Sequence, residues 1–331
     1  MLKQIYFVIT RRCNLFCDHC IRSSGPQIID NLSLQDFSKT LSPLKSISSD
    51  DCNFLITGGE PAIHKDFSAI INQVYNYFNF VVINTNGMYQ AKLIDVALKY
   101  SNLRFQISID GDKECHENIR GKKTFDRTLE TADKLSKLGN KVTIATTANL
   151  SNIASLEKLD LELKDIKYFN WTIKYEVAYG RADTSNKIPL DNWNSFVDIV
   201  CSKFLNKNRI KIDKIFPSYV FNSNNTINKN SDTLNCGTFS SKLYLNPDLT
   251  VFPCACLEEI CLGDLNSDNI EIIKTSMDKY KLQMELKNNS ICNFCPSKTL
   301  CNGGCPGATF HSFGHFGLGD PRCPAVQKSL L

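Results

Sequence analysis

The chain has 331 residues, 42% of them hydrophobic, and a formal net charge of +4 at pH 7. This size suits one large domain with a smaller one beside it, and no apolar run approaches the roughly 18 residues that a membrane span needs. Clustered Lys and Arg residues with interleaved aromatics are missing, so we expect neither a nucleic-acid partner nor a membrane partner.

The 15 cysteines are the unusual part of the composition. The chain opens on a strand-like run without an export signal, so we expect a cytoplasmic protein. Thiols stay reduced in that compartment, and many cysteines there indicate metal binding rather than disulfides. Thiolates bound to metal would also offset the formal positive charge.

From Gln4 to about Tyr175, short β-rich runs alternate with helical stretches. The expected strands are Ile5–Ile9, Asn53–Thr57, Phe80–Asn84, Arg104–Ile109, Lys141–Thr146 and Phe169–Lys174. The expected helices are Leu34–Leu44, Phe67–Phe78, Gln90–Tyr100, Thr124–Leu138 and Ile153–Leu163. Near-continuous apolar strands alternating with helices indicate an α/β fold with a parallel sheet, and we predict a partial (β/α)6 barrel similar to a TIM barrel.

We expect the barrel to span residues 1–185. An amphipathic helix at Trp193–Asn206 and an Asn-rich polar loop at Asn222–Asp232 follow, so residues 186–235 are expected to form a helical linker and a loop. Residues 236–331 are expected to form a small cysteine-rich domain.

Three cysteines follow the first expected strand in a C-x3-C-x2-C pattern, Cys13, Cys17 and Cys20. Three thiolates so close in sequence can hold a cuboidal iron–sulfur cluster and leave one iron without a protein ligand. A structural zinc site needs four ligands, so the odd count argues against zinc.

A glycine turn follows the second expected strand, in the sequence Gly58-Gly59-Glu60-Pro61. Two glycines at a strand end let a ligand approach the bare backbone. Glu60 supplies an anionic acceptor for an ammonium group. Both motifs would lie at the carboxyl edge of the sheet, where such sheets bind ligands.

Together, the cysteine triplet and the glycine turn resemble the radical S-adenosylmethionine (radical SAM) enzymes. The resemblance implies that the three thiolates hold a [4Fe-4S] cluster and that SAM binds its fourth iron. It implies that the Gly58–Glu60 turn receives the SAM amino group. One electron would cleave SAM to a 5'-deoxyadenosyl radical, which abstracts hydrogen from substrate, so an external donor of the flavodoxin or ferredoxin type is expected.

Polar residues near the ends of the next strands are candidates for SAM contacts. Asn86 and Ser108 match positions that touch SAM in the family, and Arg120 is a candidate partner for the SAM carboxylate through its planar fork. A solvated surface arginine is the alternative for Arg120. His19 is expected either to stack against the adenine or to pack beneath the cluster. Ordinary turn chemistry and helix capping are the alternative for the strand ends.

The C-terminal cysteines resemble the SPASM module, which many radical SAM enzymes acting on peptides and proteins carry. They are Cys236, Cys254, a C-x2-C-x5-C-x3-C run formed by Cys292, Cys295, Cys301 and Cys305, and finally Cys323. A hairpin turn at Asn246–Cys254 is expected to deliver one thiolate. A zinc ribbon is the alternative for the run.

The resemblance implies two auxiliary [4Fe-4S] clusters and hence three clusters in total. One would be held by Cys292, Cys295, Cys301 and Cys323, and the other by Cys236, Cys254 and Cys305. Either Cys256 or Cys261 is expected as the fourth ligand of the latter, because an exposed free thiol in such a protein is hazardous. An open iron that touches substrate is the alternative.

Auxiliary clusters give a substrate radical a route for losing an electron. We therefore expect a maturase that forms an intramolecular side-chain cross-link, of cyclophane or thioether type, on a ribosomally made precursor peptide. The alternatives are an anaerobic sulfatase maturase that oxidises Ser or Cys to formylglycine, an enzyme that edits single residues, and a non-catalytic electron carrier. Asp264 and Asp110 are candidate general bases, and an ordinary surface aspartate is the alternative.

Overall fold

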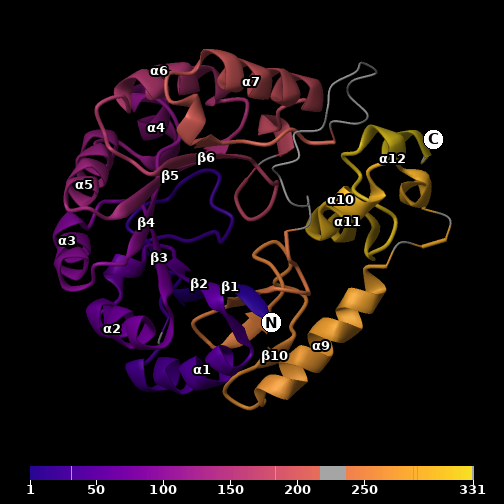
Figure 1. The fold of residues 1–331 in the computed structure, drawn as a ribbon, viewed down its shortest axis with the longest axis horizontal. Coiled ribbons are helices and arrows are strands. Elements are labelled where there is room, and N and C mark those ends of the chain that lie inside the picture. Colours follow the sequence, from indigo (N-terminus) through magenta and orange to yellow (C-terminus); the bar gives the residue numbers. More distant parts are fainter. Residues whose placement is uncertain (31, 183, 217–235, 286, 289, 330–331) are drawn as a thin grey trace.

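The structure is a computed structural model that describes residues 1–30, 32–182, 184–216, 236–285, 287–288 and 290–329. The polar loop predicted at Asn222–Asp232 lies outside these residues. Within the described part, ten strands form one sheet in the order β10-β9-β8-β1-β2-β3-β4-β5-β6-β7. Figure 1 shows the strands curving around the centre of the barrel, with helices α1, α2, α3, α5, α6 and α7 on the outside.

Strands β1 to β6 pair with one another in parallel and in chain order. The strand bounds are β1 Leu2–Thr10, β2 Ser48–Gly58, β3 Phe80–Thr85, β4 Arg104–Ser108, β5 Lys141–Ala148, β6 Asn170–Tyr175, β7 Ile210–Lys211, β8 Lys242–Leu245, β9 Thr250–Phe252 and β10 Gly263–Asp264.

The helices alternate with the strands in the barrel and cluster at the C-terminal end. Their bounds are α1 Leu34–Ser46, α2 Phe67–Tyr77, α3 Gln90–Lys99, α4 Lys113–Arg120, α5 Phe125–Lys137, α6 Leu156–Glu162, α7 Leu190–Lys203, α9 Ile270–Gln283, α10 Lys298–Cys301, α11 Pro306–Phe313 and α12 Pro324–Ser329. Short 3-10 turns η1 Pro61–Ile63, η2 Ile153–Ser155, η3 Thr184–Asn186, η4 Lys207–Arg209 and η5 Ile291–Phe294 connect them.

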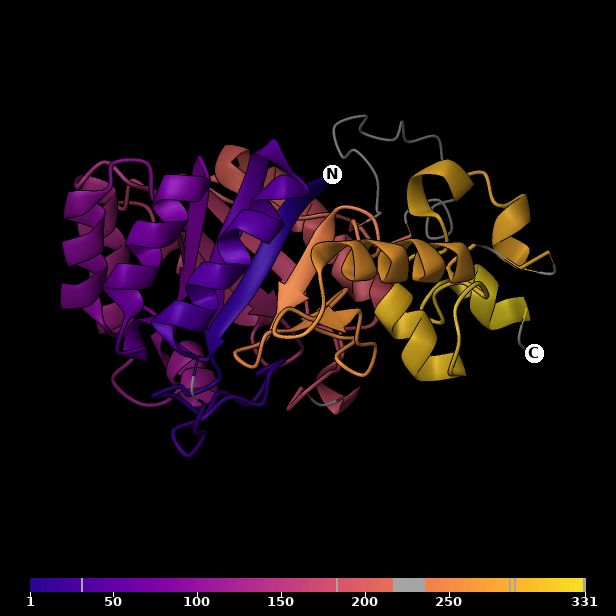
Figure 2. The ribbon, with the colours of Figure 1, turned by 90° about the horizontal axis from the view of Figure 1, so that it is seen from below.

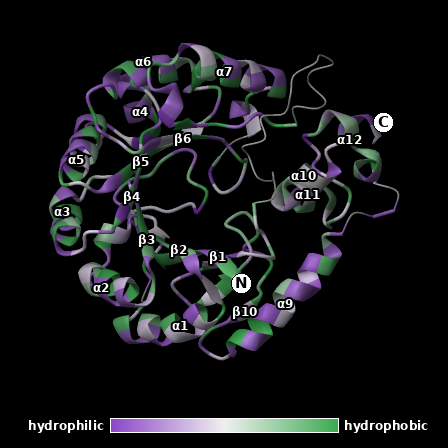
Figure 3. Cartoon of the chain, viewed as in Figure 1, coloured by the Kyte–Doolittle hydropathy of each residue, from purple (hydrophilic) through white to green (hydrophobic). Residues whose placement is uncertain are grey.

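The core lies between the sheet and the outer helices, because one face of each strand is apolar. On β1, Ile5, Phe7 and Ile9 are all fully buried. The Phe7 ring meets Phe37 of α1 at a centroid distance of 4.8 Å and Phe54 of β2 at 6.1 Å. Burying one such side chain contributes about 1.5–3 kcal/mol. Figure 3 shows the outer helices carrying both hydrophilic and hydrophobic residues, as amphipathic helices do.

The predicted fold is confirmed for the barrel. Each of the six expected strands and five expected helices is present, and Ile153–Leu163 divides into η2 and α6. The expected helix at Trp193–Asn206 is α7, which begins and ends three residues earlier. Helix α4 was not expected; the Asp112 side chain caps it by accepting the N–H of Cys115.

The sheet extends past the first predicted cysteine of the C-terminal region. Strand β8 pairs in parallel with β1, so that Gln4 faces Lys242 and Tyr6 faces Tyr244. The expected hairpin is confirmed, since β9 pairs antiparallel with β8. The C-terminal region is therefore continuous with the barrel sheet at β8, while the three predicted domain ranges stay a prediction. Figure 2 shows helices α9 to α12 beside the barrel.

Among the described helices, none combines the length and the apolar character required to cross a membrane.

Candidate functional site

The cysteine triplet lies in the loop that leaves the carboxyl end of β1 (Figure 2). Cys13 and Cys17 are buried, and Cys20 is half-buried. The N–H of Leu15 lies 3.5 Å from the Cys13 Sγ, and the N–H of Ser24 lies 3.4 Å from the Cys20 Sγ. Burial raises the pKa of Cys13 to about 12, which favours the protonated thiol in the absence of a positively charged partner.

The glycine turn fits closely against the end of β1. The N–H of Gly59 donates to the carbonyl of Thr10 at 2.8 Å, and the N–H of Glu60 donates to the carbonyl of Arg12 at 3.0 Å. A Cβ on Gly58 would lie 2.3 Å from the Thr10 carbonyl oxygen, and one on Gly59 would lie 2.4 Å from that of Arg12. The backbone of the cysteine loop itself therefore requires both glycines.

Glu60 joins the ends of β2 and β3. Its fully buried carboxylate accepts from the hydroxyl of Thr85 at 2.8 Å, from the N–H of Asn86 at 2.7 Å and from the N–H of Ala62 at 3.2 Å. Burial raises the pKa of Glu60 to about 7, although these donors oppose the shift. Glu60 thus orders the strand ends, and its contact with a SAM amino group stays a prediction.

Asn86 lies beside the cysteine loop, as its predicted role requires. Its amide donates to the Asn14 Oδ1 at 2.9 Å and lies 3.8 Å from the Cys13 Sγ. Ser108, the other predicted SAM contact, is half-buried at the carboxyl end of β4, opposite Ala145 of β5. Both residues stay candidate SAM contacts.

Asp110, directly after β4, joins three parts of the site. Its fully buried carboxylate bonds to the His19 Nε2 at 2.7 Å, the Arg120 Nε at 2.5 Å and the N–H of Thr147 at 2.9 Å. Burial would raise the pKa of Asp110, but the Arg120 guanidinium and the His19 hydrogen bond hold it well below its usual range. Such a carboxylate is suited to positioning its partners and not to accepting a proton from substrate.

Arg120 is not a surface residue, so that alternative was wrong. The side chain is only 11% exposed, and its Nη1 lies 3.9 Å from the Cys17 Sγ. His19 is likewise buried, at 7% exposure, with its ring fixed by Asp110. Arg120 of α4 and His19 of the cysteine loop thus both contact the Asp110 carboxylate. Their contacts with bound SAM stay a prediction.

Asp264, the other candidate base, lies on the edge strand β10 and caps a turn. Its carboxylate accepts from the backbone N–H and the side-chain amide of Asn266 at 2.8 and 2.9 Å. Its own N–H donates to the Asp268 carboxylate at 2.7 Å. This geometry favours the ordinary structural alternative for Asp264.

The loop after β6 hydrogen-bonds to the cysteine loop, a contact that the sequence did not predict. The Arg181 side chain donates to the carbonyl of Cys17 at 2.9 Å, and its N–H donates to the carbonyl of Cys20 at 3.1 Å. Its guanidinium also stacks over the Phe16 ring at 3.8 Å. Gly180 has φ +69, and a Cβ there would lie 2.5 Å from the Cys20 carbonyl oxygen. The sequence signal that could have indicated this contact is the pair Gly180-Arg181 after the sixth strand.

His116, which carries no functional signal in the sequence, contacts the backbone of Asp110. The N–H of Asp110 donates to the His116 Nδ1 at 3.2 Å, and the imidazole is fully buried. Burial, with the positive charge of Arg120, lowers the pKa of His116 to about 4. The imidazole is therefore neutral at pH 7 and acts as a hydrogen-bond acceptor.

Four C-terminal cysteines form a first group of neighbouring thiols, Cys236, Cys254, Cys256 and Cys305. The Cys256 thiol bonds to that of Cys254, which lowers the pKa of Cys254 to about 6. Cys305 interacts electrostatically with both Cys256 and Cys236. The exposed Cys261 thiol instead lies 3.4 Å from the carbonyl of Gly263. The structure therefore brings Cys256, and not Cys261, to this group.

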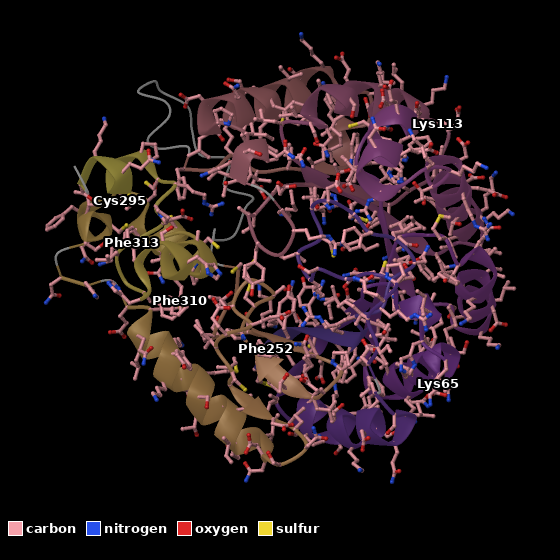
Figure 4. All side chains as sticks on the ribbon, turned by 180° about the vertical axis from the view of Figure 1, so that it is seen from behind. Lys65, Lys113, Phe252, Cys295, Phe310 and Phe313 are labelled. Atoms are coloured by element: carbon pink, nitrogen blue, oxygen red, sulfur yellow. The ribbon has the colours of Figure 1, made fainter. Side chains whose placement is uncertain are left out.

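The remaining C-terminal cysteines form a second group, Cys292, Cys295, Cys301 and Cys323, whose charges influence one another. A Cβ on Gly319 would lie 2.6 Å from the Cys292 Sγ, so the chain passes closely over this thiol. Figure 4 shows Cys295 and Phe313 in the C-terminal helical region, beside the barrel. The ligand sets predicted for the two auxiliary clusters combine these same cysteines, and they stay a prediction.

The donor set fits iron–sulfur clusters. The structure contains no disulfide among its 15 cysteines, all of which lie in the described segments. In those segments, no three Cys, His, Asp or Glu side chains are placed to hold a single metal ion. Each thiolate of a [4Fe-4S] centre binds a different iron, and the neighbouring thiols of Cys13, Cys17 and Cys20 are donors of the kind that such a centre needs.

Comparison with known proteins identifies the domain that the first half of the chain forms. Residues 7–159 match the radical SAM superfamily. The chain therefore carries a radical SAM domain, formed by the barrel and its cysteine loop, and its cysteine-rich C-terminal region is consistent with a SPASM module.

Two relatives from Bacillus subtilis match along most of the chain. The subtilosin biosynthesis protein AlbA is 26% identical over 313 residues, 90% of this chain, and the sporulation killing factor maturation protein SkfB is 26% identical over 282 residues, 85% of it. The chain spans 66% of the length of each, just under two thirds. Mycofactocin maturase MftC of Mycolicibacterium smegmatis is 30% identical over 46% of this chain and 38% of its own length.

Solved structures share the fold along the whole chain. Streptococcus suis SuiB bound to its precursor peptide SuiA has a TM-score of 0.78 at 16% identity, covering 98% of this chain and 76% of SuiB. AnSMEcpe with bound AdoMet has a TM-score of 0.73 at 17% identity, covering 99% of this chain and 94% of that one. These likenesses confirm the predicted fold, a partial barrel followed by a cysteine-rich region.

Proposed function

We propose that this protein is a radical SAM peptide maturase that forms an intramolecular side-chain cross-link, of cyclophane or thioether type, on a ribosomally made precursor peptide. One observation carries the proposal. The similarity to AlbA and SkfB covers 90% and 85% of this chain, well beyond the radical SAM domain that ends near residue 159. The names of both relatives describe biosynthesis or maturation.

The barrel residues divide the work of the first site. Cys13, Cys17 and Cys20 would hold a [4Fe-4S] cluster, which with bound SAM supplies a carbon radical that abstracts hydrogen from the peptide. Glu60 fixes the turn and Asn86 on which SAM would rest. Asp110 bonds both to His19 of the cysteine loop and to Arg120 of α4, and so joins the two segments. These buried contacts exclude water and fix the geometry before substrate binds.

The C-terminal cysteines would hold the clusters that accept an electron from the substrate. The first cysteine group would hold one auxiliary [4Fe-4S] cluster, with Cys256 as its fourth ligand. The second group would hold another. Oxidation of a substrate radical by one electron, with loss of a proton to solvent, then completes the loss of two hydrogens. A precursor peptide and an external one-electron donor of flavodoxin or ferredoxin type are the proposed partners.

The test is tandem mass spectrometry of a precursor peptide encoded beside this gene, co-expressed with the protein under low oxygen. We expect a product that lacks two hydrogens and whose backbone fragmentation is suppressed between the joined residues. Cys17→Ala should abolish the product, and Cys201→Ala, at an exposed cysteine on α7, should leave it intact. Cross-linking by the Cys17→Ala variant would refute the assignment of the cysteine loop.

The same measurement separates the alternatives. Loss of two hydrogens confined to one Ser or Cys, with a product that a hydrazine reagent traps, would mean formylglycine formation. An unmodified peptide without reductive release of 5'-deoxyadenosine from SAM would indicate an electron carrier. Either result would overturn the proposal.

A further inference from the structure

The chain around the second cysteine group presents positive charge to solvent. Between Lys287 and Ser329 the sequence has three lysines and one arginine but a single acidic residue, Asp320. That carboxylate is buried, and the Arg322 guanidinium donates to both of its oxygens, from Nε at 2.9 Å and from Nη2 at 2.7 Å. The three lysines, in contrast, are all exposed. The surface charge of this segment is therefore basic.

Two of these lysines belong to one patch, which Asn293 holds together. The Lys298 Nζ donates to the Asn293 Oδ1 at 2.9 Å, and the Asn293 Nδ2 donates to the carbonyl of Lys287 at 2.7 Å. The Lys287 Nζ in turn lies 3.3 Å from the His315 Nδ1. Among the residues that the structure describes, neither lysine has a carboxylate as its partner. Both charges are therefore available to an anionic protein surface.

An exposed aromatic side chain, Phe294, directly follows Asn293 in this patch. Phe294 is 80% exposed, and the two residues stand between Cys292 and Cys295 in the chain. Figure 4 shows Cys295 on the side of the C-terminal helical region that lies away from the barrel. Aromatic residues surrounded by polar ones are typical of protein–protein interfaces. A protein that covers Phe294 would therefore also approach two thiols of the second group.

We propose that the Phe294 patch, formed by Lys287, Asn293, Phe294, Lys298 and His315, is the docking surface of an acidic one-electron carrier protein of the flavodoxin or ferredoxin type. This inference rests on the proposed function, which places a [4Fe-4S] cluster in the second group. Electron-transfer partners form small, weak interfaces, and complementary charges accelerate their encounter. Phe294 supplies the apolar contact, and the two lysines supply the charge.

The electron transfer at this surface is balanced by the carrier itself. The substrate radical loses one electron to the auxiliary clusters and one proton to solvent. The oxidised carrier then takes one electron from the cluster of the second group and is reduced by one electron, and no bond forms or breaks. The protein is thereby ready to oxidise another peptide.

The test is isothermal titration calorimetry of the full chain, with its clusters reconstituted, against a purified acidic flavodoxin in the absence of oxygen. Lys287→Glu and Lys298→Glu should each weaken binding about tenfold, because like charges then meet across the interface. Phe294→Ala should weaken it about tenfold through lost apolar contact. Two matched controls should leave the affinity unchanged. They are Lys207→Glu, at an exposed lysine whose Nζ also donates to an uncharged partner, and Phe169→Ala, at an aromatic that is 51% exposed.

Two further measurements show whether charge governs the contact and whether electrons cross it. Raising the ionic strength from about 0.05 M to about 0.5 M should weaken binding, because salt screens exposed charges. A basic cytochrome c should not bind. In stopped-flow mixing of the reduced protein with oxidised flavodoxin, Lys298→Glu should slow formation of the flavin semiquinone. This experiment uses the Cys17→Ala background, so that the electron comes from the C-terminal region.

The iron content of each variant is measured alongside its affinity. Flavodoxin binding that none of the three patch substitutions weakens, or no binding by the parent protein, would overturn the inference. Should Phe294→Ala lose iron, the two lysine variants decide. If Lys298→Glu weakened binding of the precursor peptide and not of flavodoxin, the patch would belong to the substrate and the inference would fail. A parent protein that cross-links peptide but shows these failures would overturn the inference alone. Absence of auxiliary iron in the parent protein would overturn the assignment of clusters, and the inference with it.

Discussion

Asp110→Asn tests whether the buried Asp110 carboxylate organises the cysteine loop. The asparagine keeps the shape, and its Oδ1 still accepts the N–H of Thr147. Its Nδ2, however, faces the Arg120 Nε and the His19 Nε2, so donors now oppose donors. Each lost bond to a charged group is worth about 1.5–3 kcal/mol, and a buried charge left without its partner costs about 3–5 kcal/mol. We expect a loss of about 3–5 kcal/mol in the free energy of unfolding.

The assay is urea denaturation of the protein without metal, followed by circular dichroism, with iron content measured separately after reconstitution. Asp126→Asn, which removes an exposed partner of Lys113, is the matched control and should have no measurable effect. Adding Arg120→Met to Asp110→Asn should recover part of the loss, because the unpaired buried charge is then gone. A loss below about 1 kcal/mol in Asp110→Asn, or strict additivity in the double variant, would refute the reasoning.

Three further predictions follow from single contacts. Gly59→Ala should reduce the iron bound by the cysteine loop, because its Cβ would lie 2.4 Å from the Arg12 carbonyl oxygen. Gly139→Ala, whose Cβ would have no atom within 4 Å, is the control. Equal iron loss in both variants would contradict the prediction. Cys256→Ser should lower total iron content and Cys261→Ser should not; the reverse order would show that Cys261 is the ligand. The pKa of His116 is about 4 in the folded protein, below its usual value, so the unfolded chain binds a proton there first as the pH falls. The free energy of unfolding should therefore decrease between pH 6.5 and pH 4, by up to about 1.4 kcal/mol per pH unit. His116→Gln should flatten the pH dependence of urea denaturation in that range, and an unchanged slope would exclude His116 as its cause.

The barrel was predictable because its signals are local. Apolar runs such as Ile5–Ile9 define the buried strands, and each is followed by a helix whose apolar face covers it. The cysteine triplet and the glycine turn are contiguous motifs, so their position at the strand ends followed from the same pattern. Six parallel strands in chain order then bring both motifs to one edge of the sheet.

The contacts that organise the site were not predictable in this way. In the sequence, Arg120 is a charged residue in a polar segment, which does not indicate burial. The packing of α4 against the cysteine loop buries it beside Asp110. The choice between Cys256 and Cys261 depends on where β9 and α11 place neighbouring thiols, which sequence distance does not reveal. Strand β8 is four residues long, and nothing local in it specifies pairing with β1.

The loop after β6 contacts both the cysteine loop and the neighbourhood of Cys256. On one side Arg181 bonds to the carbonyls of Cys17 and Cys20. On the other, the Tyr179 hydroxyl lies 3.4 Å from the Glu259 carboxylate, and the Tyr179 ring lies against His311, whose Nε2 is 2.6 Å from the Cys256 carbonyl. A displacement of this loop would therefore alter contacts both at the cysteine loop and near Cys256. Strand β6 ends in Tyr175, and the Arg322 guanidinium lies 6.0 Å from the Tyr175 ring centroid, so the end of this strand lies near both the cysteine loop and the C-terminal region.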